Sequence, residues 1–380
     1  MAMQAPFRLL TSLRGSVEVG LSLAIAVATS TFVATPLILP AVAERYDVGT
    51  GTAGVFSAAQ LGAFVVGSWG AGRVTEPSRR LFVQSLLLLS AANVVSAVAP
   101  AFGVLVGARG AAGLALGVLT WLAYSQVFGD ADRTGDIAVI GPIAGVVAAP
   151  VIGAVLAQGD DQIVFFALAG ITLVPLARVP RFVVPELTSS VRSRPVPQAL
   201  VLIVGLALVT FGGAGVFVFL GAVGVEQYGL DPFVISLVFS ANAAAGIPSA
   251  RWRGGRRYAG AWFLLPALFS VLVTALDQPV VFWVLVTAWG FCFWMAIPGI
   301  YTLLAERSRH PAERAGDAQA AMAAGRALGP LAGGVVVGAG GFGTLGVCGA
   351  VVMVGAALAI VGVEVRGGAA SPADDEGGPP

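Results

Sequence analysis

The sequence predicts an all-α integral membrane protein whose twelve transmembrane helices form two pseudo-symmetric six-helix bundles. Hydrophobic residues make up 57% of the chain and charged residues 11%, and the mean hydropathy is +0.90. Soluble domains carry roughly 25% charged residues, so lipid must face most of this surface. Long apolar runs recur along the whole chain, and a polar, proline-containing stretch near the middle separates two similar halves.

Composition excludes several classes of protein. The net charge of +1 leaves no large basic face for nucleic acid, and the sequence has no phosphate-binding Gly-Lys-Ser/Thr loop for ATP. Cys292 and Cys348 lie in separate apolar segments without metal-ligand spacing, and His310 lies among charges in a polar loop. We therefore expect no metal, no cofactor and no enzymatic activity. All 21 basic residues are Arg, which hints at a GC-rich bacterial genome.

Each predicted span is an apolar run of about 20 residues, the length that a helix needs to cross the hydrocarbon layer. The first run is too long for the core of a signal peptide, so we expect it to be retained. The predicted spans are 17–40, 53–72, 81–99, 102–126, 136–157, 162–178, 198–222, 233–250, 259–276, 279–303, 317–339 and 343–364.

The distribution of Arg predicts the orientation, because cytoplasmic loops are enriched in basic residues. With both termini in the cytoplasm, Arg45 is the only basic residue of the outer loops. The outer loops are otherwise acidic, with Glu44, Asp47, Asp160, Asp161, Glu226, Asp231 and Asp277. The cytoplasmic loops hold Arg73, Arg79, Arg80, Arg133, Arg178, Arg181, Arg192, Arg194, Arg251, Arg253, Arg256, Arg257, Arg307, Arg309 and Arg314.

The chain divides into four segments. Residues 1–180 form the predicted N-terminal six-helix bundle and residues 198–365 the C-terminal one. Residues 181–197 contain three prolines and read as a cytoplasmic linker. Residues 366–380 are rich in Gly, Pro and acidic residues, so we expect a disordered cytoplasmic tail.

An internal repeat relates the two halves at an offset of about 180 residues. Residues 149–153 (APVIG) match residues 329–333 (GPLAG), which pairs Pro150 with Pro330. The Arg cluster at 73–80 likewise matches the one at 251–257. Duplicated six-helix halves place a substrate site near the membrane midplane, between the halves.

Three motifs resemble those of the major facilitator superfamily, and the resemblance extends over essentially the whole chain. Residues 67–80 (GSWGAGRVTEPSRR) follow the family pattern Gly-x-x-x-Asp-Arg-x-Gly-Arg-Arg after the second span. Arg73 is kept, the Asp is absent, and Glu76 is the candidate to replace it. Residues 109–117 (RGAAGLALG) resemble the motif of the fourth span.

The third motif indicates a branch of the family. Residues 145–153 (GVVAAPVIG) resemble the antiporter signature of the fifth span, with Pro150 and Gly153 kept and one Gly replaced by Ala. The prolines of residues 36–40 (PLILP) also resemble the drug:proton antiporter branch. This resemblance implies export rather than import.

Charged side chains inside a bilayer are costly and are functional candidates by default. Only Arg109 and Arg326 lie deep within spans. Arg109 heads a small, polar stripe with Gly113, Thr120 and Tyr124, which predicts a cavity lining. The alternatives are an Arg that extends to the outer interface, for Arg109, and an Arg that binds carbonyls at the Pro330 bend, for Arg326.

No Asp or Glu lies in the middle of a span. Asp136 and Asp317 lie at predicted helix starts, where the helix dipole favours a carboxylate, so capping is one role for them and coupling another. Glu18, at the cytoplasmic start of the first span, is the best candidate for proton coupling. Without such a carboxylate the protein would not couple transport to protons.

Three further side chains are candidates for the cavity. Trp294 lies at mid-depth in the tenth span, where it would stack on a flat apolar ligand or pack against neighbouring helices. Gln60 and Asn242 would hydrogen-bond either to substrate or across helices.

Together these features predict a monomeric secondary transporter of the bacterial inner membrane. The first expectation is proton-coupled efflux of small, partly apolar solutes, without ATP. The alternative is an organic-anion carrier that uses Arg109 and Arg326, because these two Arg face no buried acid. A receptor or assembly factor that kept the fold would need a sensory domain or a long loop, and the sequence contains none.

Overall fold

The computed structural model describes residues 18–127, 131–183, 194–250, 258–308 and 311–368. Several predictions lie outside these residues: most of the 181–197 linker, the second Arg cluster, His310, and the tail beyond residue 368. Every secondary-structure element of the described part is helical. The all-helical prediction is therefore confirmed for the described residues.

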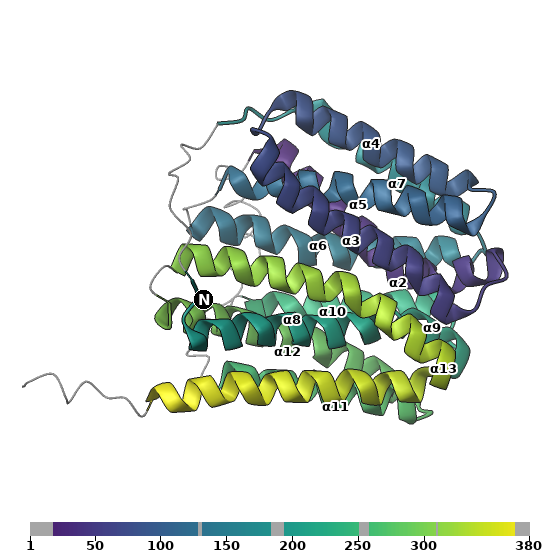
Figure 1. The fold of residues 1–380 in the computed structure, drawn as a ribbon. Coiled ribbons are helices and arrows are strands. Elements are labelled where there is room, and N and C mark those ends of the chain that lie inside the picture. Colours follow the sequence, from purple (N-terminus) through teal and green to yellow (C-terminus); the bar gives the residue numbers. More distant parts are fainter. Residues whose placement is uncertain (1–17, 128–130, 184–193, 251–257, 309–310, 369–380) are drawn as a thin grey trace, which may run out of the picture.

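The helices follow one another with short connections (Figure 1). The first group is α2 Val19–Arg45, α3 Thr50–Val74, α4 Arg79–Val98, α5 Phe102–Ser125, α6 Ala131–Leu156, α7 Asp161–Thr172 and the 3-10 helix η1 Val174–Arg178. The second group is α8 Pro197–Phe217, α9 Leu220–Ala222, the π-helix η2 Val223–Gln227, α10 Pro232–Ala250, the 3-10 helix η3 Ala259–Phe263, α11 Leu264–Ala275, α12 Pro279–Glu306 and α13 Pro311–Gly368.

Each predicted span is helical over most of its length. Ten helical segments of the described chain are long and apolar enough to cross a membrane, and Ala259–Ala275 is a shorter apolar one. The last two predicted spans both fall in α13, which consists of two helical stretches joined at Gly341, where φ is 72°. Only glycine adopts such a φ at low cost, so Gly341 sets the bend between them.

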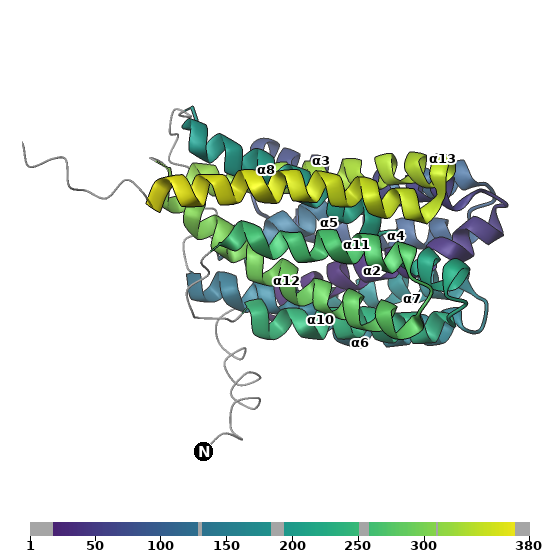
Figure 2. The same ribbon diagram turned by 90° about the horizontal axis from the view of Figure 1, so that it is seen from below.

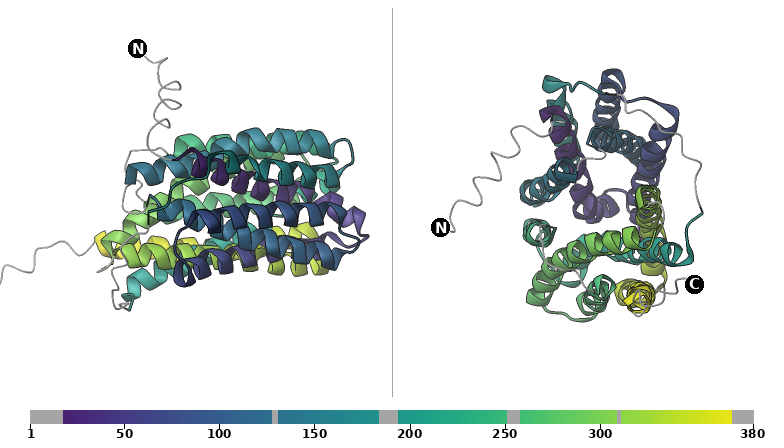
Figure 3. Two further views of the ribbon diagram at one scale, coloured as in Figure 1. Left: turned by 90° about the horizontal axis from the view of Figure 1, so that it is seen from above. Right: turned by 90° about the vertical axis from the view of Figure 1, so that its left-hand side faces the viewer.

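The helices run side by side along one axis in Figure 1 and in the perpendicular view of Figure 2. Figure 1 shows α4, α5 and α7 in the upper part and α8, α11 and α12 in the lower part. The view along the axis in Figure 3 separates the early helices from the later ones. Three main pairs join the groups: α3 packs on α13, α6 packs on α10, and α2 packs on the short helix α9.

The internal repeat is visible in how the helices pack. A Cβ added to Gly113 of α5 would lie 2.0 Å from the backbone oxygen of Gln60 on α3. In the second group, a Cβ added to Gly290 of α12 would lie 2.2 Å from the backbone oxygen of Asn242 on α10. Glycine is required at both places because the helices approach too closely for any side chain.

The groups meet tightly at one end of the molecule, here termed the closed end, which carries the α2–α3 and α6–α7 turns. A Cβ on Gly51 would lie 2.3 Å from the oxygen of Gly334, and one on Gly221 would lie 2.0 Å from the oxygen of Pro36. Thr50 donates a hydrogen bond of 2.6 Å from Oγ1 to the Glu226 carboxylate across the same junction.

The hydrophobic core divides along the axis. At the closed end one cluster contains residues of both groups, among them Leu37, Phe56, Phe219 and Trp289. Away from this end the core separates into two clusters. One contains buried residues between Leu21 and Ile137 only, and the other contains buried residues from Ala199 onward only. The two groups therefore share a core at the closed end and have separate cores toward the opposite end.

Candidate functional site

Arg326 lies on α13 in the part of the molecule where the two cores have separated, and its side chain is exposed. Its orientation follows from the glycines on either side. Cβ atoms on Gly325 and Gly329 would lie 2.2 Å and 2.4 Å from backbone oxygens of α8, so that face of α13 is pressed against α8. Successive helical residues are rotated by about 100°, so Arg326 points away from α8.

The groups that interact electrostatically with the Arg326 guanidinium come from both halves of the chain. They are the phenols of Tyr301 on α12 and Tyr124 on α5. The ring of Phe293, also on α12, lies 6.0 Å from the guanidinium carbon. Since α5 packs on α3 and α4 whereas α12 packs on α10, an exposed Arg326 between Tyr124 and Tyr301 faces the space between the two groups. We term Arg326, Tyr124 and Tyr301 the central site.

The predicted stripe on α5 is divided in the structure. Tyr124 is 37% exposed, and Thr120, one turn earlier, is half-buried on the same side of the helix. Arg109 is only 1% exposed and Gly113 is in contact with α3, so neither lines the central site. The stripe predicted from helical spacing therefore faces the central site only at Thr120 and Tyr124. Arg109 and Gly113 pack inside the N-terminal group.

Arg109 is held by neutral side chains of the neighbouring helices. Its Nε donates to Gln60 Oε1 at 3.0 Å, and its Nη1 donates to Asn93 Oδ1 at 2.8 Å and to Ser96 Oγ at 3.2 Å. The guanidinium carbon lies 5.3 Å from the centre of the Phe165 ring. Arg109 does not extend to the interface, and it does not reach the central site.

Gln60, Asn242 and Trp294 connect helices within a group. Gln60 is 1% exposed and donates to Thr35 Oγ1 at 3.4 Å besides accepting from Arg109. Asn242 donates to the Val286 carbonyl on α12 at 2.7 Å. Trp294 is half-buried and packs so closely on α10 that a Cβ on Gly246 would lie 2.5 Å from its ring. These contacts show the three side chains packing one helix against another within a group.

The motif after α3 lies at the end opposite the closed end. Arg73 stacks on Trp69, with 3.8 Å between its guanidinium carbon and the ring centre. Glu76 is exposed, and among the described residues it forms no ion pair that would replace the missing Asp. Ser78 caps α4 by accepting a hydrogen bond from the Leu81 amide at 3.3 Å. The glycines of this motif pack α3 on α5: a Cβ on Gly67 would lie 2.3 Å from the Leu114 oxygen.

The antiporter-like signature and its counterpart lie at the junction of the two groups. A Cβ on Gly153 would lie 2.1 Å from Ser236 Oγ on α10. Pro150 lies one turn earlier on α6. In the repeat, the Pro330 oxygen on α13 lies 3.4 Å from a Cβ built on Gly54. These prolines therefore lie in the α6–α10 and α3–α13 pairs that join the groups.

The acidic candidates lie away from the central site. Glu18 is exposed at the start of α2 and accepts a hydrogen bond of 2.9 Å from the Arg181 amide. Asp317 does not cap a helix as expected, because α13 begins at Pro311, and proline at the first helical position favours that earlier start. It pairs instead with Arg314 at 2.7 Å. Asp136 lies within α6 rather than at its start, since α6 begins at Ala131.

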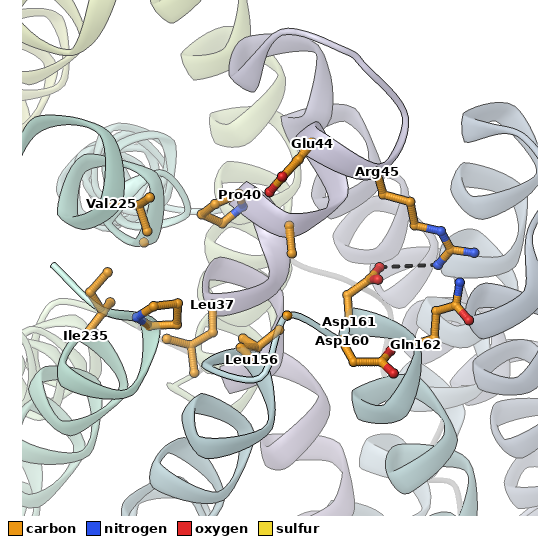
Figure 4. Close-up of a pocket in the computed structure, with 14 residues that line it drawn as sticks. Leu37, Pro40, Glu44, Arg45, Leu156, Asp160, Asp161, Gln162, Val225 and Ile235 are labelled. Carbon is orange, nitrogen blue, oxygen red and sulfur yellow. Dashed lines mark hydrogen bonds and ion pairs between the residues drawn. The ribbon is translucent and has the colours of Figure 1, made fainter. Parts of the chain in front are cut away.

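A cavity of about 570 Å³ lies at the closed end between α2, the α6–α7 turn and the start of α10 (Figure 4). Arg45 and Asp161 form an ion pair of 3.2 Å on its wall, and Arg45 also donates to the Ala97 carbonyl at 2.8 Å. The sequence singled out Arg45 only as the lone base of the outer loops. Among the described residues no group of His, Cys, Asp and Glu side chains could hold a metal ion.

Ten apolar helical segments of the described chain are long enough to cross a membrane, which defines a multi-pass membrane protein. The chain belongs to the Major Facilitator Superfamily, whose family model matches residues 20–334, and it is therefore a transporter rather than an enzyme.

Solved structures with the same fold have a TM-score above 0.6 at low sequence identity. The nucleoside transporter NupG has a TM-score of 0.70 at 12% identity, covering 90% of this chain and 98% of that one. A bacterial homologue of the human lysosomal transporter Spinster, in an inward-facing and occupied conformation, has 0.66 at 13% identity and 96% of each chain. The human organic anion transporter TETRAN has 0.62 at 13%, covering 90% and 97%. None of the curated proteins matches this sequence.

Proposed function

We propose that this protein is a secondary transporter of small, partly apolar organic anions, and that the central site binds their negative charge. The observation that carries the proposal is the exposed Arg326, between Tyr124 of one group and Tyr301 of the other. No carboxylate of the described residues interacts with this guanidinium. An uncompensated positive charge attracts anions and repels cations strongly where solvent screening is poor.

We propose further that twelve spans form two six-helix bundles, residues 1–180 and 198–365, acting as a monomer in a bacterial inner membrane. The count treats the two stretches of α13 as separate spans and includes Ala259–Ala275. The Arg distribution puts both termini in the cytoplasm, so that the closed end faces outward and this conformation is inward-facing. Reporter fusions after Gly159 and Tyr228 should then report the periplasm, and one after Arg194 the cytoplasm. A periplasmic signal at Arg194 would overturn this topology.

Proton-coupled efflux, as in the drug:proton antiporter branch, is the second candidate. What favours it is the signature around Gly153, which lies where α6 meets α10. It requires a carboxylate that changes protonation during the cycle, and Glu18, immediately before α2, is the candidate. If protons drive transport, Glu18→Gln abolishes flux driven by a pH gradient and leaves downhill exchange intact. Flux that ignores both the gradient and this substitution leaves the anion carrier as the function.

Transport assays in proteoliposomes test the anion proposal directly. A small aromatic carboxylic acid, its neutral amide and a quaternary ammonium dye differ mainly in charge. We expect saturable uptake of the acid, weaker uptake of the amide and almost none of the dye. Efficient transport of the dye would contradict the proposal, because its fixed positive charge would have to pass Arg326.

A further inference from the structure

The cavity at the closed end is lined by both groups of helices. Its apolar wall includes Leu37 and Pro40 of α2 on one side, and Val225 of η2 and Ile235 of α10 on the other. Its volume of about 570 Å³ lies within the range of roughly 300–1,000 Å³ that is typical of sites for small organic molecules. An organic molecule in this cavity would therefore have room, and apolar contact with both groups at once.

The polar part of the wall carries an excess of negative charge. It contains three carboxylates, those of Glu44, Asp160 and Asp161, and one guanidinium, that of Arg45, so its net charge is −2. The guanidinium is already occupied, because Nη1 donates to Asp161 at 3.2 Å and Nη2 donates to the Ala97 carbonyl at 2.8 Å. It neutralises Asp161 and leaves the other two carboxylates without a positive partner on this wall.

Of these two carboxylates, Glu44 is the one that is available to a ligand. Asp160 caps α7 by accepting a hydrogen bond of 3.0 Å from the Ile163 amide. Glu44 is exposed, and its carboxylate forms no hydrogen bond and no ion pair within the described part of the chain. In Figure 4 it points toward the side of Val225, whereas Arg45 extends to the opposite side of α2. A cation between α2 and η2 would pair with Glu44 beside apolar surface, where their attraction is screened less than in water.

The η2 wall has an uncommon backbone. η2 is a π-helix, a conformation that is rare, occurs mostly as single turns and is frequent at functional sites. The same turn carries Val225, which lines the cavity, and Glu226, which accepts the hydrogen bond from Thr50 that joins the groups. A ligand against this turn therefore acts on the contacts that keep the closed end shut.

We propose that this cavity binds an organic cation with an apolar body, and that Glu44 pairs with its charge. Because the ligand contacts both groups, it stabilises the conformation in which they meet at the closed end. The site is separate from the central site: Leu37 belongs to the core that both groups share, whereas Arg326 lies where the cores have separated. Binding here does not depend on what the protein transports, and the ligand has the opposite charge to the proposed substrate.

The first test is the thermal stability of the purified protein in detergent with tetraphenylphosphonium, and with triphenylphosphine oxide, a neutral molecule with a similar apolar body. At about ten times its dissociation constant, we expect the phosphonium ion to raise Tm on the order of 2 °C, with saturation. The neutral molecule should have no such effect. Equal responses to the two compounds would overturn the proposal, because apolar contact alone would then explain the binding.

Variants locate the response at the cavity. Glu44→Gln should lose it, and its Tm without ligand should be unchanged because Glu44 is exposed. Asp47→Asn is the matched control: it removes an exposed carboxylate from the same end, outside the cavity lining, and Asn readily adopts the φ of 50° at this position. Asp47→Asn should keep the response, as should Arg326→Gln. A response that Glu44→Gln keeps, or that Asp47→Asn or Arg326→Gln loses, overturns the proposal.

Proteoliposomes test whether the bound cation holds this conformation. The closed end has to open during each transport cycle, so the phosphonium ion at about ten times its dissociation constant should slow the uptake of an organic acid about 10-fold in the unmutated protein and not in Glu44→Gln. This readout rests on the transport function proposed above. If no acid is taken up, that function fails while the Tm response still tests the site. If uptake continues at the full rate while Tm rises, the cation does not hold the conformation, and this part of the proposal is wrong.

Discussion

The two arginines within the spans, Arg109 and Arg326, differ in their exposure and in the groups that they contact. Arg109 is fully buried in the N-terminal group and gives three hydrogen bonds to side chains of α3 and α4. Arg326 is exposed in the C-terminal group, where its guanidinium carbon lies 6.0 Å from the Phe293 ring and the phenols of Tyr124 and Tyr301 interact with it electrostatically. The first holds helices of one group together, and the second is available to a ligand between the groups.

The comparison shows that depth in the membrane does not by itself identify a substrate-binding charge. Both side chains meet the criterion of an ionisable group inside a span. They differ in what their neighbours on the helix do. Gly113, one turn after Arg109, presses α5 onto α3, whereas the glycines beside Arg326 press α13 onto α8 and leave the arginine on the other face. Helix packing therefore decides which of the two arginines faces the space between the two groups.

The largest effect is expected for Arg109→Leu. The substitution leaves the acceptors of Gln60, Asn93 and Ser96 without their donor, at about 1–3 kcal/mol for each unsatisfied group. We expect strongly reduced yield and a lower Tm. Adding Asn93→Leu should restore part of the stability, because it removes one of these groups from the core. A stable Arg109→Leu protein that has simply lost transport would mean that Arg109 acts on the substrate, against the comparison.

Arg326→Gln should have the opposite profile. It removes a charge-assisted contact to the substrate, worth about 1.5–3 kcal/mol, so transport of an organic acid should fall by about 10- to 100-fold. Tm should change little, since the side chain is exposed and forms no ion pair among the described residues. Parallel uptake and Tm measurements check both statements. Normal uptake by this variant would remove Arg326 from the substrate site.

The sequence could predict the fold better than it could predict which residues form the central site. The apolar runs predict the all-helical membrane fold directly, and the motifs at residues 67–80, 109–117 and 145–153 resemble those of the family, so fold and family could both be predicted. The place of Gly113 could not, because a stripe of small residues favours a cavity wall and a helix contact equally. Arg109 and Thr120 lie on one face of α5 at helical spacing, yet that face passes from the packed interior of the group to the open space. The structure shows where the packed part of this face ends, because Gly113 contacts α3 whereas Tyr124 lies toward Arg326 and Tyr301 of α12.

Replacement by Lys sharpens the comparison with a smaller change. Arg109 uses separate nitrogens of its planar fork for Gln60 and Asn93, and a single ammonium cannot reach both in the same geometry. Arg109→Lys should therefore still lower Tm. At position 326 the ammonium keeps the charge, so we expect Arg326→Lys to retain part of the uptake that Arg326→Gln loses. Identical uptake by the Lys and Gln variants would show that the fork, rather than the charge, binds the substrate.

The smallest effects are expected from the two phenols of the central site. The hydroxyl of Tyr301 donates to Met322 Sδ, a weak acceptor, at 3.8 Å, and that of Tyr124 has no hydrogen-bond partner among the described residues. An anion held by Arg326 is a stronger acceptor than a thioether sulfur, so we expect both hydroxyls to donate to it when it binds. Tyr124→Phe and Tyr301→Phe should each raise KM about 2- to 10-fold, the value of one neutral hydrogen bond, and leave Tm unchanged.

Tyr228→Phe is the matched control for these substitutions. The Tyr228 hydroxyl donates to the Val273 carbonyl at 2.7 Å, in the cluster shared by both groups at the closed end. Its loss should lower Tm and leave KM unchanged, because the hydroxyl holds η2 to α11 and lies outside the central site. If all three variants change Tm and none changes KM, the phenols near Arg326 pack the helices as Arg109 does. The central site would then consist of Arg326 alone, and the contrast between the two arginines would be one of exposure without a built binding site.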